Sequence, residues 1–382
     1  MTMKTKQEIF RENLAAYLAA DKAEKGRILD SVCRITGCHR KAAVRRFANL
    51  QMRDAARGER RGRNIEYGAA VTAALHELWN MASRICAERL RPQITEYVRV
   101  LQRDRMWQHD DATTQSLLAM SAATMKRRIA LFENVKKKGG RGTTKPSDLK
   151  EIIPVRRGPW MHPLPGNGEI DTVAHCGTTL VGDYCYTVQY TDVATIWTCL
   201  AGQWNKGEDE TVRSISRVRE HLPFPLRGID PDSGGEFINW HLEGWCRRRN
   251  ITMTRTRPYM KNDHARIEQK NYANVRHVVG YTRFDDESQV TILNELYDAL
   301  EDYINFFLPS QKCVQKERIG SRYVKQYDTA KTAYARVLAH PDIDAAVKMK
   351  LQKKYATLNP KYLKDECDRL VRKLLAVRPK LR

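Results

Sequence analysis

Three acidic residues in separate segments place the strongest constraint on the fold of this chain. Asp171 lies in EIDTVAHCG, Asp232 opens DSGGEF, and Glu268 lies within RPYMKNDHARIEQKN, with 35 residues between the last two. Carboxylate oxygens are the ligands that Mg²⁺ and Mn²⁺ prefer. We therefore expect a fold that brings these three segments together as one divalent-metal site.

Enzymes that cut and join DNA strands with metal ions have a signature of three acids. It consists of one Asp, a second Asp, and a Glu that is separated from the second Asp by 35 residues, as here. Residues 165–310 resemble the catalytic core of the DDE family, which comprises bacterial insertion-sequence transposases and retroviral integrases. The resemblance assigns Asp171, Asp232 and Glu268 as catalytic residues and metal ligands. Ser233, where the family more often has asparagine, is a minor departure.

Each of these acids has an ordinary structural alternative. Glu169 shares a strand face with Asp171, because side chains alternate along a strand, and Asp230 stands two residues before Asp232. A glutamate in the second turn of a polar helix, as expected for Glu268, is usually only solvated. The flanking RPYMKND and QKN segments and the spacing favour the catalytic interpretation.

Carboxylates gathered in one place need cations. Two of them about 4 Å apart would repel by about 4 kcal/mol at an effective dielectric constant near 20. The resemblance implies two Mg²⁺ or Mn²⁺ ions, with Asp171 bridging both and Asp232 and Glu268 each completing one. It also implies the reaction: water releases a 3′ hydroxyl at the end of a mobile element, and that hydroxyl then attacks target DNA.

The net charge of +22 is unevenly spread along the chain. Residues 165–310 contain 15 Lys and Arg against 21 Asp and Glu, whereas the net charge is +12 over residues 311–382 and +16 over residues 1–164. Basic flanks around an acidic centre favour arms that hold double-stranded DNA, although a basic surface can also serve only solubility. Because no long apolar run or signal-peptide pattern is present, we expect a cytoplasmic, nucleoid-associated bacterial protein.

Nine cysteines are scattered without any CxxC pair. The cluster of Cys33, Cys38 and His39 lacks a fourth ligand at the spacing of a zinc site. Some integrases have an N-terminal His-His-Cys-Cys zinc domain, and this chain has no such constellation. We therefore expect reduced, structural thiols.

Residues 1–58 predict a helix-turn-helix module that binds DNA. Ile28, Val32 and Ile35 are spaced for one apolar helix face, Gly37 breaks the pattern, and a second helix follows. The side chains expected to contact phosphates and base edges are on the second helix: His39, Arg40, Lys41, Arg45 and Arg46. The alternative is a plain helical hairpin with a charged outer face.

Residues 66–135 predict a second helix-turn-helix module. The segment ATTQSLLAMSAATMKRRIALF contains a turn of small residues near 121–123, and the helix after it bears three candidate DNA-binding residues: Lys126, Arg127 and Arg128. The basic segment ERRGRN (59–64) is typical of a linker that follows the DNA backbone. Residues 136–160, with KKKGGRGTTKPSD, predict a flexible linker.

Residues 161–310 predict a ribonuclease H-like α/β core, a mixed five-stranded sheet flanked by helices. Three consecutive strand patterns, EIDTVAHC, DYCYTVQYTDVAT and IWTCLAGQW, precede a helix at 208–221. The strand PLRGID, the helix EFINWHLEGWCRRR, the strand ITMTRTR and a closing helix at 287–307 follow, with the helix of Glu268 between them. The four tryptophans of the core, Trp197, Trp204, Trp240 and Trp245, are expected in its interior.

Five further residues are candidates for DNA contact near the acids. Arg255 and Arg257 precede the helix of Glu268, and Lys270, Asn271 and Arg276 follow that glutamate. A solvated helix face is the alternative for the last three.

Residues 311–382 form a basic C-terminal region. The sequence predicts a short β element followed by helix, and an amphipathic final helix in YLKDECDRLVRKLLAV. We expect non-specific DNA binding or subunit assembly from this region.

Together these features predict a DDE-type transposase, with N-terminal DNA-recognition modules, a metal-dependent core and a basic tail. Two element ends cut in concert imply a homo-oligomer on DNA, at least a dimer. Two alternatives stay open. One is a nuclease of the same fold that hydrolyses without joining, and the other is a domesticated DNA-binding regulator whose core is silent.

Overall fold

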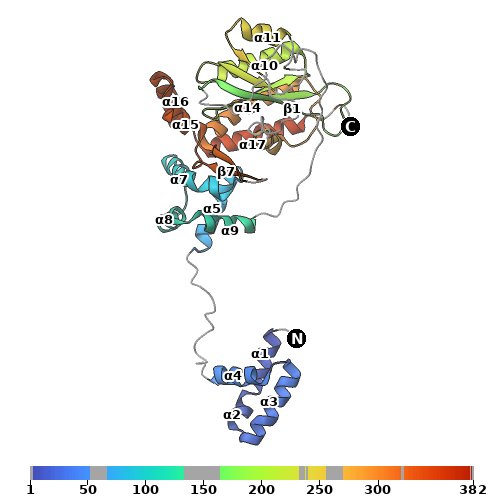
Figure 1. The fold of residues 1–382 in the computed structure, drawn as a ribbon, viewed down its shortest axis with the longest axis vertical. Helices are drawn as coiled ribbons and strands as arrows, with labels where there is room; N and C mark the ends of the chain where they lie inside the picture. The colour runs from blue at the N-terminus through green and yellow to red at the C-terminus, as the bar shows by residue number, and fades with distance from the viewer. Residues whose placement is uncertain are drawn as a thin grey trace. The chain divides into compact units, whose positions relative to one another are not determined.

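The computed structural model describes residues 3–51, 67–132, 164–231, 237, 240–254, 270–319, 322–378 and 380 (Figure 1). The chain divides into two compact units, Met1–Glu66 and Tyr67–Arg382, and each is described by itself. Four predicted site residues lie outside the described residues: Asp232, Arg255, Arg257 and Glu268.

The described part of the first unit is helical. Its helices are α1 (Met3–Glu12), α2 (Leu14–Ala19), α3 (Lys22–Thr36) and α4 (Arg40–Gln51). They surround a small apolar core made of Phe10, Leu29, Val32, Ala43 and Phe47. Five buried side chains are few, so this unit has little apolar area with which to resist unfolding.

Helix α3 ends where the sequence predicts a break. Gly37 adopts a left-handed φ of 66° and its amide closes the helix on the Cys33 carbonyl. The predicted apolar face is wrong at its end, because Ile35 is 52% exposed while Thr36 is buried. Positions three and seven residues after Leu29 share its side of a helix, and the threonine hydroxyl there bonds back to the Val32 carbonyl at 2.6 Å.

The second unit begins with a helical block over residues 67–132. Its helices are α5 (Ala69–Met81), α6 (Ala87–Leu90), the 3₁₀ turn η1 (Arg91–Gln93), α7 (Ile94–Arg103), α8 (Asp111–Ala119) and α9 (Ala122–Phe132). The sequence predicts a module of its own here, but the block packs into the same compact unit as the residues that follow. The Tyr97 hydroxyl donates to the Phe307 carbonyl at 2.6 Å, and Arg103 donates to the Leu358 carbonyl at 2.9 Å.

A five-stranded mixed sheet forms the centre of this unit. Its strands are β1 (Asn167–Ala174), β2 (Cys185–Asp192), β3 (Thr198–Trp204), β4 (Gly228–Pro231) and β5 (Thr252–Met253), in the order β3-β2-β1-β4-β5. The first three strands are antiparallel, and β4 and β5 run parallel to β1. This order is consistent with the predicted ribonuclease H-like core.

Helices cover both faces of the sheet, with α10 and α11 on one side and α14 and α17 on the other (Figure 1). The helices around the sheet are α10 (Glu208–His221), α11 (Trp240–Arg247), the π-helical segment η4 (Asn271–Arg276), α13 (His277–Val279) and α14 (Ser288–Phe307). Trp197 and Trp245 are buried as predicted. No helix among the described residues is both long and apolar enough to cross a bilayer.

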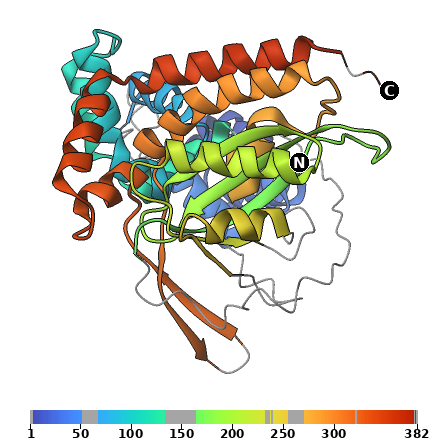
Figure 2. The same cartoon turned by 90° about the horizontal axis from the view of Figure 1, so that it is seen from above.

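The C-terminal region contains a hairpin and three helices. These elements are β6 (Cys313–Ile319), β7 (Arg322–Tyr327), α15 (Ala333–Ala339), α16 (Ala345–Thr357) and α17 (Pro360–Ala376). The hairpin is a separate two-stranded sheet that projects away from the core (Figure 2). The predicted amphipathic final helix buries Cys367, Leu370 and Leu374 against the core, alongside α14.

Helix α14 satisfies the open edge of β3 with its side chains. The Asn294 amide bonds both backbone groups of Gly202, at 2.9 and 3.2 Å. The Asn305 amide bonds both backbone groups of Thr198, each at 2.8 Å. Between these two positions, the Glu301 carboxylate accepts the Leu200 amide at 2.6 Å. Glu301 and Asn305 follow Asn294 by 7 and 11 positions, so the three side chains share one helix face. They take the place of the hydrogen-bonding strand that the edge strand β3 lacks on this side.

The replacement Asn305→Ala should destabilise the second unit by about 2–4 kcal/mol. The change removes the Asn305 side chain that bonds the buried amide and carbonyl of Thr198, and each orphaned group costs about 1–3 kcal/mol. Denaturant unfolding followed by circular dichroism measures the effect. The control is Glu295→Ala on the same helix, which breaks only an exposed ion pair to Lys373 of α17 and should cost less than about 1 kcal/mol.

The pair of His221 and Glu301 predicts a pH dependence of stability. The hydrogen bond from His221 Nδ1 to the carboxylate, 2.9 Å long, raises the pKa of the imidazole above its ordinary 6.5. A raised folded-state pKa contributes stability below the unfolded pKa and loses it as pH rises through the folded value. The free energy of unfolding should therefore fall as pH increases above 6.5. Equilibrium unfolding across pH should show a smaller fall in His221→Gln, and an identical fall would contradict this origin.

Candidate functional site

The start of β1 is fixed by a buried carboxylate. Asp192 accepts hydrogen bonds from the Gly166 amide at 2.8 Å and from the amide and hydroxyl of Thr195, both at 2.7 Å. Burial raises the pKa of Asp192 to about 6, against the opposing effect of these bonds. Two residues after Gly166, a Cβ at Gly168 would lie 2.3 Å from the ring of the buried Tyr190, so only glycine fits there. These contacts fix the register of β1, the strand that bears Asp171, relative to its neighbour β2.

Asp171 lies in the middle of β1 and is half-buried. Its Oδ1 accepts the Thr172 amide at 2.7 Å, and its Oδ2 accepts Nδ2 of Asn271 at 2.5 Å. Two donors on one carboxylate fix its orientation. The contact joins the first predicted acid to a residue three positions after Glu268 in the sequence.

A second hydrogen bond holds the same helical segment along β1. Arg276 donates to the Ala174 carbonyl at 2.6 Å, and its guanidinium lies 4.9 Å from the centre of the Tyr281 ring. Burial lowers the pKa of Arg276 from its ordinary value of 12.5. Asn271 and Arg276, five residues apart, reach the same strand because η4 is π-helical, a form often found at functional sites.

The two competing acids are more deeply buried than Asp171. Glu169 and Asp230 are register partners on the parallel strands β1 and β4, and they are 2% and 0% exposed. Asp230 accepts the Thr254 hydroxyl at 2.6 Å. A substrate phosphate reaches a half-exposed carboxylate more readily than a fully buried one, so the geometry favours Asp171 over Glu169.

The other two predicted acids, Asp232 and Glu268, lie outside the described residues, and their roles stay predictions. Their chain neighbours are described: β4 ends at Pro231, and Lys270 begins the helical segment beside β1. Within the described ranges no three His, Cys, Asp or Glu side chains are grouped to hold a metal ion.

Positive charge gathers at the start of this segment. Lys270 is partly enclosed, and burial together with the charges of Arg89 and Arg336 lowers its pKa to about 7. An anion beside it would stabilise the ammonium form. The prediction that Lys270 contacts DNA stays open.

The basic residues of α4 differ in their availability. Arg40 forms an ion pair with Asp30 on α3, and Arg46 lies 5.4 Å from the centre of the Phe10 ring. His39, Lys41 and Arg45 are exposed. DNA contact by this helix stays a prediction, and it would rest mainly on the exposed side chains.

The basic residues of α9 show a similar division. Lys126 pairs with Glu88 at 2.8 Å, and Arg128 donates to the Tyr67 carbonyl at 2.7 Å. Arg127 is exposed and donates to Thr124 of its own helix at 3.1 Å. Two of the three predicted DNA-binding residues thus also stabilise the helical block.

Sequence reasoning missed the structural role of Asp192. The signal was available, because an aspartate three residues before a threonine is typical of a turn in which the carboxylate caps the following amide. The sequence also predicted that Asn271 contacts DNA, whereas its side chain donates a hydrogen bond to Asp171. The spacing of three from Glu268, about one helical turn, is the local signal that this amide stays near the site.

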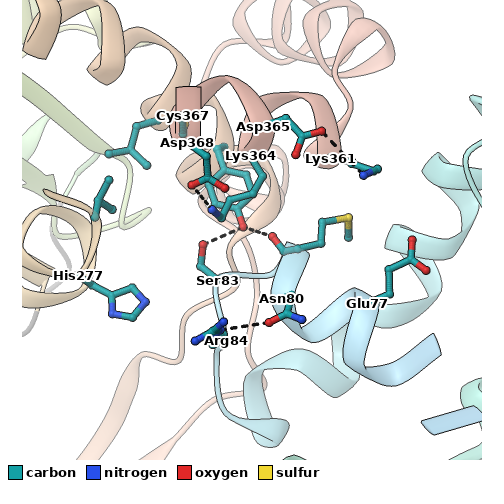
Figure 3. A pocket seen from close by; sticks show the side chains of 14 residues that line it. Glu77, Asn80, Ser83, Arg84, His277, Lys361, Lys364, Asp365, Cys367 and Asp368 are labelled. Carbon is teal, nitrogen blue, oxygen red and sulfur yellow. Dashed lines mark hydrogen bonds and ion pairs between the residues drawn. The ribbon is translucent and has the colours of Figure 1, made fainter. Parts of the chain in front are cut away.

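A cavity of about 600 Å³ lies between α5, α13, α14 and α17, apart from the residues of the predicted site (Figure 3). Its charged walls pair internally: Lys364 binds Asp368, Lys361 lies 3.8 Å from Asp365, and Arg84, in the turn after α5, donates to Asn80 of that helix. Because acids and bases balance there, the cavity favours no class of ligand.

Comparison with known proteins shows the family of the chain. No family model matches it. The uncharacterized protein y4rM of Sinorhizobium fredii (strain NBRC 101917 / NGR234) is 36% identical over 329 residues, covering 86% of this chain and 93% of that protein. The core is a mixed five-stranded sheet flanked by helices, consistent with a ribonuclease H-like core. The chain belongs to the family of y4rM.

Among solved structures, the HTLV-2 integrase catalytic core domain in complex with magnesium (trimeric form) matches 37% of this chain and 87% of that domain. The sequence identity is 15% and the TM-score is 0.27. The strand order and register of the sheet remain the basis of the fold assignment.

The contact between Asp171 and Asn271 predicts a metal-dependent stability in one variant. Asn271→Asp would place a second carboxylate beside Asp171, and the repulsion should destabilise the second unit by up to about 4 kcal/mol in EDTA. Mg²⁺ or Mn²⁺ should restore much of the loss. Thermal unfolding with and without metal measures both effects. Asn271→Ala, which loses only one hydrogen bond, should show a small loss of about 1 kcal/mol that metal does not reverse.

Proposed function

We propose that this protein is a DDE-type DNA transposase, a polynucleotidyl transferase that cleaves DNA at the ends of a mobile element and joins the freed end to target DNA. The main support is the hydrogen bond from Asn271 to Asp171. It holds the first acid of the motif against the segment that follows the third acid in the chain. The second acid, Asp232, follows the last residue of β4, the parallel neighbour of β1.

The carboxylates Asp171, Asp232 and Glu268 would hold two Mg²⁺ or Mn²⁺ ions. The donor chemistry fits, since the one described ligand is a half-buried carboxylate oriented by two hydrogen bonds. When bound, such ions activate the attacking oxygen and stabilise the leaving oxygen of a phosphodiester.

The protein's own residues hold the site in place. Asn271 orients the Asp171 carboxylate, and Arg276 fixes the helical segment along β1. Asp192 and Thr195 set where that strand begins. The attacking group is water or a DNA hydroxyl, so no covalent protein nucleophile is needed.

DNA binding is assigned to the basic regions outside the core. The exposed Lys41 and Arg45 of α4 and Arg127 of α9 would bind phosphates, together with His39, which directly precedes α4. Arg255 and Arg257 are proposed to contact DNA next to the acids. Concerted cutting of two ends requires a homo-oligomer, which we propose forms on DNA.

The experiment compares Asp171→Asn and Asp232→Asn with the wild type in Mg²⁺-dependent cleavage and strand transfer of labelled DNA carrying the element ends. Each variant should lose at least about 10³-fold in cleavage rate, because removing a metal ligand removes several kcal/mol of transition-state stabilisation. DNA affinity should be retained. The matched control Asp183→Asn changes an exposed acid in the loop between β1 and β2 and should leave cleavage unchanged.

Three outcomes separate this proposal from its rivals. Cleavage followed by a joined product supports a transposase. Mg²⁺-dependent nicking without any joined product indicates a hydrolytic nuclease of the same fold. Sequence-specific binding without cleavage in any divalent metal indicates a regulator with a silent core.

A further inference from the structure

The β6–β7 hairpin is an isolated two-stranded ribbon on the second unit (Figure 2). Its exposed residues include Val314, Val324 and Tyr327, which are 63%, 47% and 53% exposed. Two-stranded hairpins are marginally stable by themselves. Such a ribbon gains stability when its face is covered by a partner.

The base of the hairpin is held firmly. Asp328 accepts the Lys312 amide at 2.6 Å and binds Arg336 of α15, also at 2.6 Å. Ser310 and Lys331 form a β-bridge just before and after the two strands. The hairpin therefore leaves the core in a defined direction.

The register divides the hairpin residues between two faces of different charge. Residues opposite one another share a face, and neighbours along a strand alternate. One side, which we call the basic face, has three cations, two tyrosines and no acid: Lys316, Arg318, Tyr323, Lys325 and Tyr327. The other side has one cation and one acid: Gln315, Glu317, Ile319, Arg322, Val324 and Gln326.

The basic face contains an unfavourable cross-strand pair. Lys316 and Lys325 are direct register partners. Like charges directly opposite one another destabilise an antiparallel pair. An anionic partner on that face would turn the repulsion into attraction.

We propose that the basic face of the β6–β7 hairpin binds the sugar-phosphate backbone of duplex DNA. A two-stranded ribbon fits the major groove, and Lys, Arg and Tyr are common donors to phosphate oxygens. The inference rests on the proposed function, in which DNA is the substrate. It assigns part of the DNA-binding surface to this hairpin.

Solubility gives a competing explanation for charges on an exposed ribbon, since lysines discourage edge-to-edge pairing of strands. That explanation predicts cations on both faces. By register, one face has three cations and no acid, whereas the other has Arg322 and Glu317. The asymmetry favours a polyanion on one side.

The test uses the full chain and fluorescence anisotropy with a labelled duplex of random sequence, across a series of KCl concentrations. Lys316→Gln/Lys325→Gln should weaken affinity roughly tenfold. It should also make the slope of log affinity against log salt shallower by about 1.8, from two lost phosphate contacts. Because this variant removes a like-charge pair, its thermal unfolding should occur at or slightly above the wild-type temperature.

The matched control compares two arginines of the same hairpin. Arg318→Gln on the basic face should reduce the slope by about 0.9, whereas Arg322→Gln on the other face should leave it unchanged. Equal losses from both would overturn the face assignment in favour of general charge attraction. A change in oligomeric state with unchanged DNA affinity would overturn DNA as the occupant and indicate a second copy of the chain.

Failure of the hairpin proposal is distinguishable from failure of the proposed function. A wild-type protein that cleaves and binds DNA while the basic-face variants behave identically overturns only the hairpin assignment. A wild-type protein without affinity for any duplex overturns both.

Discussion

Helix α14 completes the open edge of the sheet, and the position of the site depends on that interaction. Polar side chains of one helix face bond the alternate backbone groups of β3, so the helix and the strand cannot slide past each other. The same helix contacts β2 through a hydrogen bond between the Tyr297 and Thr187 hydroxyls. A hydrogen bond between the Tyr303 and Ser83 hydroxyls joins it to the helical block. A sheet anchored in this way gives the acids of β1 a fixed support, which metal chemistry requires.

Strand β1 is defined at both ends by side chains from other parts of the chain. Asp192 holds its beginning, and Asn271 and Arg276 attach η4 along its second half. The carboxylate of Asp171 thus lies between a buried anchor and a helical segment. Preorganisation of this kind places ligand oxygens before an ion arrives, so little binding energy is lost to reorientation.

Much of this fold could be predicted from the sequence because its elements have strong local periodicity. The helices expected at 208–221 and 287–307 are observed at Glu208–His221 and Ser288–Phe307. The packing of the helical block could not be predicted, because contacts such as Arg103 with Leu358 join residues 255 positions apart and leave no local pattern. The Asn271 contact was also missed, since a π-helical turn changes which residues share a helix face.

The acidic charge of the core is informative about function because DNA is also an anion. Glu169 and Asp230 are register partners on neighbouring strands, with Asp171 two residues further along β1. A protein that only held DNA through its basic flanks would bind more tightly with neutral residues at these positions, since clustered acids repel one another and repel phosphate. Divalent cations remove that conflict by binding carboxylate and phosphate oxygens together. For this reason the proposed function assigns the acids to chemistry on the DNA backbone and not to binding alone.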